Sequence, residues 1–445
     1  MKTYIVLQYE PNFKEFKVKK IIISLLCLIV NGFILNAQYR NLDFYIGQAK
    51  KNSPLINQAK NENKLVYLDL QQMNKILYKP EINLVSGLTF SPIVSHDVGS
   101  SGLKLVSRDA TDYIGHDLAL TDGGQYQALV SLRQPLLTGS KYDAYVAKAD
   151  ISEKINANNI SLTEHELEQI VGYQYLFCIL SSKEAENMLS LVRDLEDQYK
   201  LLEKLVENGV YKQTDLMLMQ LELENYNLEY KGYWSDYAAN LYDLNLICGI
   251  SDSTIVKLQD HEFSLNQTKV VESGFLTGYR LDSLSIISDL TIDELKYKPQ
   301  LDLFTDVGLN ASYLPYPKRL GLSFGLAFTW NIFDGNQREI QREKSAVNLQ
   351  TIEFNKNNFM IQNQMNKNKV IAQIESIIDR IQLNETQQEQ YQRIADAYLK
   401  ELRLGEASVM DYKNLLNDIA VKKQELLQLN MEKQFLINSY NYLNF

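Results

Sequence analysis

The chain has 445 residues, of which 45 are Lys or Arg and 55 are Asp or Glu, so its formal net charge is −10 at pH 7. Such an acidic balance disfavours nucleic acid as a partner, because binding to phosphates needs clustered positive charge. Cys178 and Cys248 do not make a disulfide framework, and no Cys or His pair has zinc spacing, so we expect buried thiols and neither metal nor cofactor.

Residues 1–37 are predicted to be a signal peptide. A basic stretch precedes the short apolar run 21–30, and Ala37 is a small residue at a plausible cleavage point. The alternative, a membrane anchor, is disfavoured because ten residues do not span a bilayer. Cleavage would remove five lysines and two glutamates, leaving 40 basic and 53 acidic residues. No later stretch approaches 18 apolar residues, which leaves a soluble periplasmic or extracellular protein, or a β-barrel.

The first half, residues 38–246, is predicted to contain a helix, two strands and a helical hairpin. The helix covers about 42–77, the strands cover about 81–91 and 126–136, and the hairpin covers about 139–246. Apolar residues alternate along both strands, and the first arm of the hairpin has no proline as far as Val206. Between the strands, the Ser-, Gly- and Asp-rich segment 92–125 lacks a phosphate-binding motif and is predicted to be a solvent loop.

Residues 247–281 are predicted to be an irregular join, and residues 282–445 to repeat the pattern of the first half. We expect a helix over 282–296, strands over about 300–312 and 321–333, and a hairpin over about 336–442. In the last strand every second residue from Leu322 to Ile332 is large and apolar, whereas Phe304 is the one misfit in the strand before it.

Two landmarks support an internal repeat, because they share an offset of 196 residues. The strand-to-helix joints 134–139 and 330–335 align at this offset, and so do the hairpin turns 209–215 and 405–411, each of which reads Gly-x5-Asp. A shared offset is far less expected by chance than one match, so the chain is predicted to be two similar halves.

Alternating segments of roughly ten residues are typical of outer-membrane barrel strands, although a half-buried soluble sheet has the same pattern. Four strands are too few to close a membrane barrel, so several chains would have to build one together. Asp302, Asp306 and Asn310 lie opposite the apolar side of their strand and would line the lumen of a barrel. Their simplest role there is hydration of a water-filled pore.

The chain resembles the TolC-like outer membrane factor family in the order of its elements, which is signal peptide and then, twice, strand pair, long helix, Gly-x5-Asp turn and returning helix. The joints between strand and helix read Pro-Leu-Leu-x-Gly and Ile-Phe-Asp-Gly. The resemblance covers about 38–442. It implies a mixed α and β membrane protein in which three chains each lend four strands to a 12-stranded barrel and form a periplasmic tunnel of coiled-coil hairpins. It also implies a periplasmic adaptor and an inner-membrane pump as partners.

The resemblance places the hairpin turns at the periplasmic tip, where the tunnel closes. The implied gate residues are Gly209, Thr214, Asp215, Gly405, Asp411 and Asn414. Relatives carry a second carboxylate where this chain has Asn414, and an Arg where it has Ala407, for which Arg403 or Lys212 are the available substitutes. Three copies of Asp411 around a narrow opening would favour cations. The simpler alternative is that Asp215 and Asp411 are helix N-caps.

The expected function is that of a passive outer-membrane duct in tripartite efflux or type I secretion, located in the outer membrane and extending into the periplasm. No catalytic arrangement occurs in the sequence, so an enzyme is not expected. The competing interpretation is a periplasmic coiled-coil adaptor or structural protein. An adaptor typically has one hairpin between β domains, whereas two hairpins, each after a strand pair, favour the duct.

Overall fold

The computed structural model describes residues 40–97, 99, 101–105, 110–115, 124–266, 273–311 and 320–445. The predicted signal peptide and parts of the predicted loop 92–125 lie outside these ranges. Two compact units make up the chain. Unit 1 comprises Met1–Lys51, Ile170–Ser264 and Glu375–Asn438, and unit 2 comprises Asn52–Gln169, Leu265–Ile374 and Ser439–Phe445.

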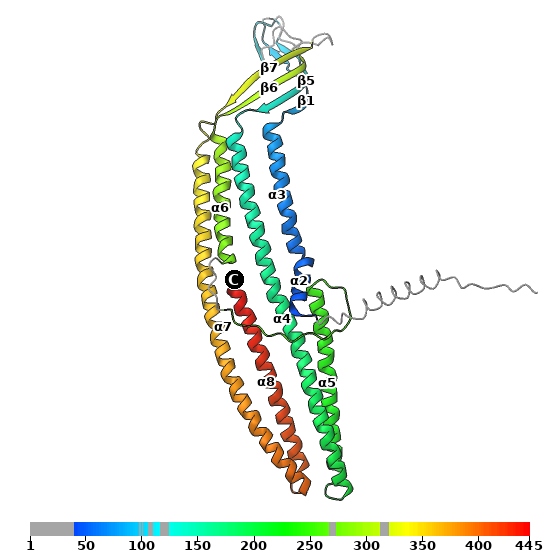
Figure 1. Cartoon of the computed structure of the whole chain (residues 1–445). Helices are drawn as coiled ribbons and strands as arrows, with labels where there is room; N and C mark the ends of the chain where they lie inside the picture. The colour runs from blue at the N-terminus through cyan, green and yellow to red at the C-terminus, as the bar shows by residue number, and fades with distance from the viewer. Residues whose placement is uncertain are drawn as a thin grey trace, which may run out of the picture. The chain divides into compact units, whose positions relative to one another are not determined.

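Unit 2 contains an antiparallel sheet of four strands, in the order β1-β5-β6-β7 (Figure 1). The strands are β1 (Glu81–Phe90), β5 (Gly124–Pro135), β6 (Gln300–Ala311) and β7 (Gly321–Thr329). The last strand was predicted to reach residue 333 but ends at Thr329, which pairs with Gln300, the first residue of β6. Pro299 has no N–H with which to extend the ladder.

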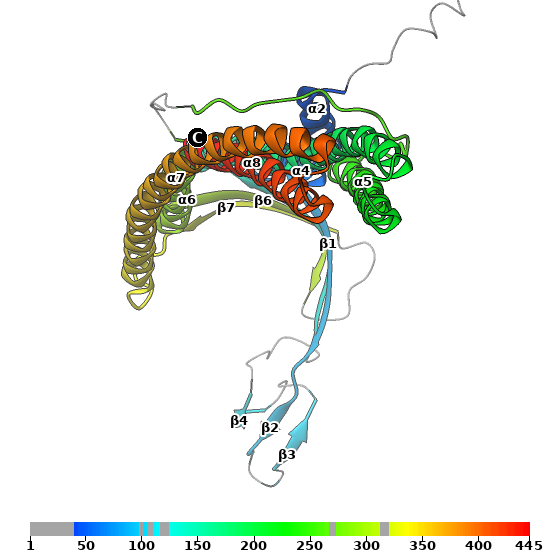
Figure 2. The same cartoon turned by 90° about the horizontal axis from the view of Figure 1, so that it is seen from below.

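The segment between β1 and β5 was predicted to be a solvent loop, but its described part forms a second sheet. β2 (Ile93–Ser95) lies between β3 (Gly102–Lys104) and β4 (Tyr113–Ile114), and Figure 2 shows this small sheet beyond the end of β1. Asp97 holds it together, because its Oδ1 accepts hydrogen bonds from the backbone N–H groups of Thr111 and Asp112 at 2.8 and 3.0 Å. Hydrogen bonds from Ser95 and Thr111 hold the pKa of Asp97 well below its usual range.

The helix predicted over 42–77 is two helices, α2 (Leu42–Asn52) and α3 (Pro54–Tyr78). Pro54 lacks an N–H and its ring clashes with the preceding turn, so a helix begins there rather than passing through. Ser53 caps α3, since its Oγ accepts a hydrogen bond from the backbone N–H of Ile56 at 3.3 Å.

The helix predicted over 282–296 begins eight residues earlier, as α6 (Gly274–Glu294), and ends in a 3-10 turn, η1 (Leu295–Tyr297). The end of the predicted join 247–281 is therefore helical. Aromatic packing explains the difference, because Phe275 and Tyr279 of α6 lie 5.4 and 5.9 Å from the ring of Phe359. Such tertiary contacts stabilise helical turns that local sequence leaves undecided.

Two helical hairpins follow the strand pairs. The first consists of α4 (Gly139–Glu207) and α5 (Gln213–Ile247), and the second of α7 (Gln337–Leu404) and α8 (Val409–Leu443). In unit 1 the hairpins share one apolar core, which includes Leu202 and Met219 from the first and Leu402 and Tyr412 from the second. Cys178 and Cys248 are buried and form no disulfide with each other, as predicted. Within the described ranges, no helix has an apolar stretch long enough to cross a membrane.

Candidate functional site

The two hairpin turns of unit 1 end their long helices with a left-handed glycine. Gly209 and Gly405 have φ values of 75° and 77°, a conformation that favours glycine after a helix C-terminus. The turns also touch each other, since a Cβ atom on Gly405 would lie 2.8 Å from Cγ1 of Val210. The two turns are therefore one packed tip, in which neither glycine can be replaced without strain.

The alternative role for Asp215 and Asp411, as helix N-caps, is wrong, because both lie three residues inside that position. Lys212 is the N-cap of α5, and its backbone N–H donates to Oδ2 of Asp215 at 3.0 Å. In α8, Oγ of Ser408 accepts a hydrogen bond from the backbone N–H of Asp411 at 3.3 Å, so Ser408 is in the capping position. The side chains of Asp411, Asn414 and Thr214 are exposed.

Tyr211 joins the two turns. Its hydroxyl lies 3.0 Å from the carbonyl oxygen of Leu402 and 2.9 Å from that of Ala407, so its single proton is shared between them. Burial raises the pKa of Tyr211, and the Asp215 carboxylate adds to this effect, which keeps the hydroxyl protonated as a donor. Tyr211 aligns with Ala407 at the 196-residue offset, and the two residues are hydrogen-bonded. The repeat alignment therefore pointed to this contact, which the sequence analysis did not single out.

A buried ion pair forms the second link between the hairpins. Nζ of Lys413 on α8 lies 3.1 Å from Oε2 of Glu222 on α5, and the two side chains are 22% and 7% exposed. Lys212 and Arg403 were the available substitutes for an Arg at position 407. Neither forms an ion pair with a carboxylate of the described residues. Sequence analysis did not identify Glu222 or Lys413. They are 191 positions apart, and no local sequence pattern pairs residues at that distance.

The four-stranded sheet has one apolar face that lies open. Large apolar side chains cover it on all four strands, and Leu84 and Phe324 are each 79% exposed. The exposed residues of this face include Ile82, Leu84, Leu88 and Phe90 on β1, Val130 on β5, Val307 on β6, and Leu322, Phe324, Leu326 and Phe328 on β7. An apolar surface of this extent is typical of contact with lipid or another apolar partner.

The opposite face of the sheet is polar and hydrogen-bonded. Asp302 accepts a hydrogen bond from Nη2 of Arg133 at 2.5 Å, and Asp306 accepts one from Oγ of Ser131 at 2.5 Å. Asn310, on the same face of β6, is exposed. The misfit Phe304 lies on this face too, with its ring over Gly325, where a Cβ atom would be 2.6 Å away.

No protein-family model and no curated protein matches the sequence. Among solved structures, the fold is that of outer-membrane channels. The outer-membrane channel OprN matches with a TM-score of 0.66 at 10% identity, over 91% of this chain and 89% of that one. The outer membrane protein VceC of Vibrio cholerae gives 0.66 at 15%, over 91% and 96%, and the outer membrane channel CmeC of Campylobacter jejuni gives 0.63 at 13%, over 91% and 85%. The resemblance in fold to the TolC-like outer membrane factors is thus confirmed.

Proposed function

We propose that this protein is an outer-membrane duct that extends into the periplasm and passes substrates outward without catalysing a reaction. The observation that carries the proposal is the two-faced sheet, apolar and exposed on one side and polar on the other. Lipid contact favours this exposed apolar face and water in a lumen favours the polar face. A soluble coiled-coil adaptor gives no reason for ten large apolar side chains on a sheet to remain open to water.

The sheet supports a homotrimer. Its outer strands, β1 and β7, each have one edge with no neighbour in the order β1-β5-β6-β7. Unpaired backbone groups are strongly unfavourable in lipid, so the edges of a membrane sheet must be paired. In the proposed trimer β7 of one chain pairs with β1 of the next, and three such sheets close a 12-stranded barrel. Each half of the chain then supplies one strand pair and one hairpin as a repeat.

The packed tip is the proposed gate. The shared hydrogen bond of Tyr211 and the Glu222–Lys413 ion pair hold the two hairpins of a chain together. Opening requires the hairpins to move apart as packed helices do in hinge or shear motions, which breaks these links. Since Asp411 is exposed at the start of α8, three copies around the opening would select for cations. Docking of a periplasmic adaptor and an inner-membrane pump, in tripartite efflux or type I secretion, would supply the energy.

Membrane fractionation together with the mass of the detergent-extracted protein tests the proposal. We expect the chain in outer-membrane fractions, and a trimer mass that falls to the monomer mass after heating. As a control, Ser323→Arg on the polar face should leave the trimer intact. A protein that remains soluble after lysis and has a monomer mass would contradict the barrel and favour the coiled-coil adaptor.

A further inference from the structure

A cavity of about 280 Å³ lies between the two hairpins in unit 1, among side chains from α4, α5, α7 and α8. Its floor is apolar, with Leu191, Leu195 and Ile419 among the lining residues. Its polar lining is mainly acidic, because it includes Asp194, Asp197 and Asp396 but only one basic residue, Lys423. Asp197 is already paired with Lys200 at 3.4 Å. The volume is just below the range of about 300–1,000 Å³ for small-molecule sites, which combine apolar walls with a few convergent polar groups.

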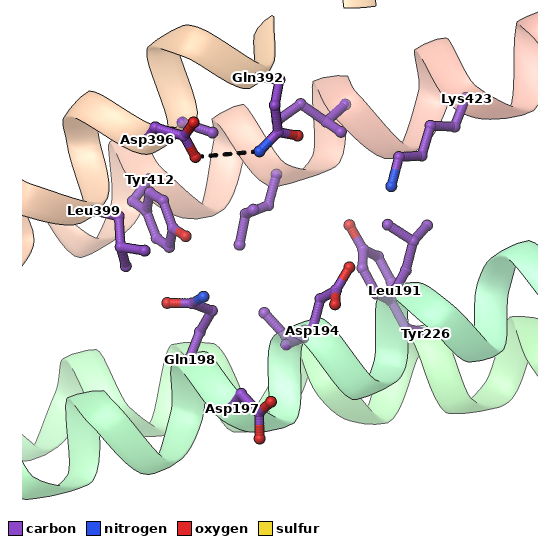
Figure 3. A pocket seen from close by; sticks show the side chains of 14 residues that line it. Leu191, Asp194, Asp197, Gln198, Tyr226, Gln392, Asp396, Leu399, Tyr412 and Lys423 are labelled. Carbon is purple, nitrogen blue, oxygen red and sulfur yellow. Dashed lines mark hydrogen bonds between the residues drawn. The ribbon is translucent and has the colours of Figure 1, made fainter.

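Two polar atoms of this cavity have no hydrogen-bond partner among the residues that the structure describes. The hydroxyl of Tyr226 and Oε1 of Gln198 are buried and unpaired, and the Tyr226 side chain is only 4% exposed. Figure 3 shows both groups pointing into the cavity, with the carboxylate of Asp194 beside Tyr226. A buried polar group without a partner destabilises the protein, so an arrangement of this kind points to a ligand that completes it.

Further acceptors lie on the opposite wall. Asp396 accepts a hydrogen bond from Nε2 of Gln392 at 3.2 Å, which leaves its other oxygen available. Burial raises the pKa of Tyr412 to about 12, and the carboxylates of Asp396 and Asp194 add to this effect. Both carboxylates therefore act on the same space between the hairpins. A cation with N–H donors would satisfy the unpaired oxygen of Gln198, the Tyr226 hydroxyl and the carboxylates together.

We propose that this cavity binds a small organic cation with an apolar body, such as an aryl-alkyl primary ammonium. The ammonium lies between Asp194 and Asp396 and donates to Gln198, and the apolar body rests on the leucine and isoleucine floor. Aromatic faces of Tyr226 and Tyr412 add cation–π attraction. This site goes beyond the proposed duct and does not depend on it, because binding to the hairpins is measured without any channel activity.

Titration calorimetry of the full chain in detergent with phenethylammonium chloride tests the proposal. We expect saturable binding of one cation per chain. The neutral isostere phenethyl alcohol should bind at least about tenfold more weakly. Asp194→Asn should weaken binding about tenfold or more, as loss of a charged hydrogen bond does. Lys423→Gln should strengthen binding, since it removes the like charge. Asp418→Asn, an exposed residue of α8 outside the cavity, is the matched control and should bind as the unaltered protein does.

Tyr226→Phe separates a binding role from a structural one. It removes an unpaired buried hydroxyl, so it should raise the thermal midpoint of the ligand-free protein while weakening phenethylammonium binding. A group that only packs the core would not shift these two readouts in opposite directions. The proposal is overturned if the unaltered protein shows no saturable binding, if the alcohol binds equally well, or if Asp194→Asn and Tyr226→Phe both bind with unaltered affinity.

Discussion

Lys413→Met should loosen the tip by breaking the buried ion pair between the hairpins. The substitution keeps most of the apolar stem of Lys413 but leaves the Glu222 carboxylate, 7% exposed, without its partner at 3.1 Å. Removing one partner of a buried pair destabilises by about 3–5 kcal/mol, because the remaining charge is no longer compensated. Since the Lys413 side chain is 22% exposed, water replaces part of the interaction, and we expect about 2–3 kcal/mol.

Such a loss corresponds to an increase of about 30- to 140-fold in the opening equilibrium of the tip, since each 1.4 kcal/mol is a factor of ten. Amide hydrogen exchange in α5 and α8 of the detergent-extracted protein measures it, because exchange there reports local opening. Lys400→Met, at an exposed position of α7, is the control and should change nothing. Adding Glu222→Gln to Lys413→Met should restore much of the protection. The reasoning is refuted if Lys413→Met exchanges no faster than Lys400→Met.

Tyr211→Phe removes the shared hydrogen bond, which contributes about 0.5–1.5 kcal/mol. The variant should therefore increase the open fraction of channels in planar bilayers. An unchanged open fraction would exclude Tyr211 from the gate. Phe324→Arg should prevent recovery of the trimer from outer membranes, because Arg on a lipid face costs about 2–4 kcal/mol per chain. If the Phe324→Arg and Ser323→Arg variants give equal amounts of trimer, the apolar face of the sheet does not face lipid. Arg338 and Arg342 lower the pKa of Glu294 from 4.5 to about 2, so its stabilising effect is complete above pH 4.5 and disappears as the pH falls towards 2. Pepsin should then cleave α6 increasingly fast over that interval, and Glu294→Gln should abolish the dependence.

Periodicity predicted the long elements well because their physics is local. Alternation in the strands and the absence of proline in the long helices are readable from the chain alone. The bounds of the strands and of the two hairpins differ from the structure by no more than a few residues, whereas α6 begins eight residues early. Where they differ, a proline or a tertiary contact set the boundary. β7 stops when its partner strand begins after Pro299, and α6 begins early because Phe275 packs on Phe359.

The candidate site was only partly predictable. The Gly-x5-Asp pattern located both turns. It also suggested the aspartates as alternative N-caps, a position that Lys212 and Ser408 hold, since capping depends on where the first helical residue falls. The links between hairpins depend on residues about 190 positions apart, such as Glu222 and Lys413, which no local spacing can associate. The same holds for the cavity, where Tyr226 is distinguished only by the absence of a partner for its hydroxyl.

Single-channel conductance of the purified, detergent-extracted protein in planar bilayers tests whether this chain is a gated duct, with the heat-modifiable oligomer mass measured on the same sample. We expect a trimer with a small, cation-preferring conductance that rises in Asp411→Ala. A water-soluble protein without channel activity would contradict this expectation.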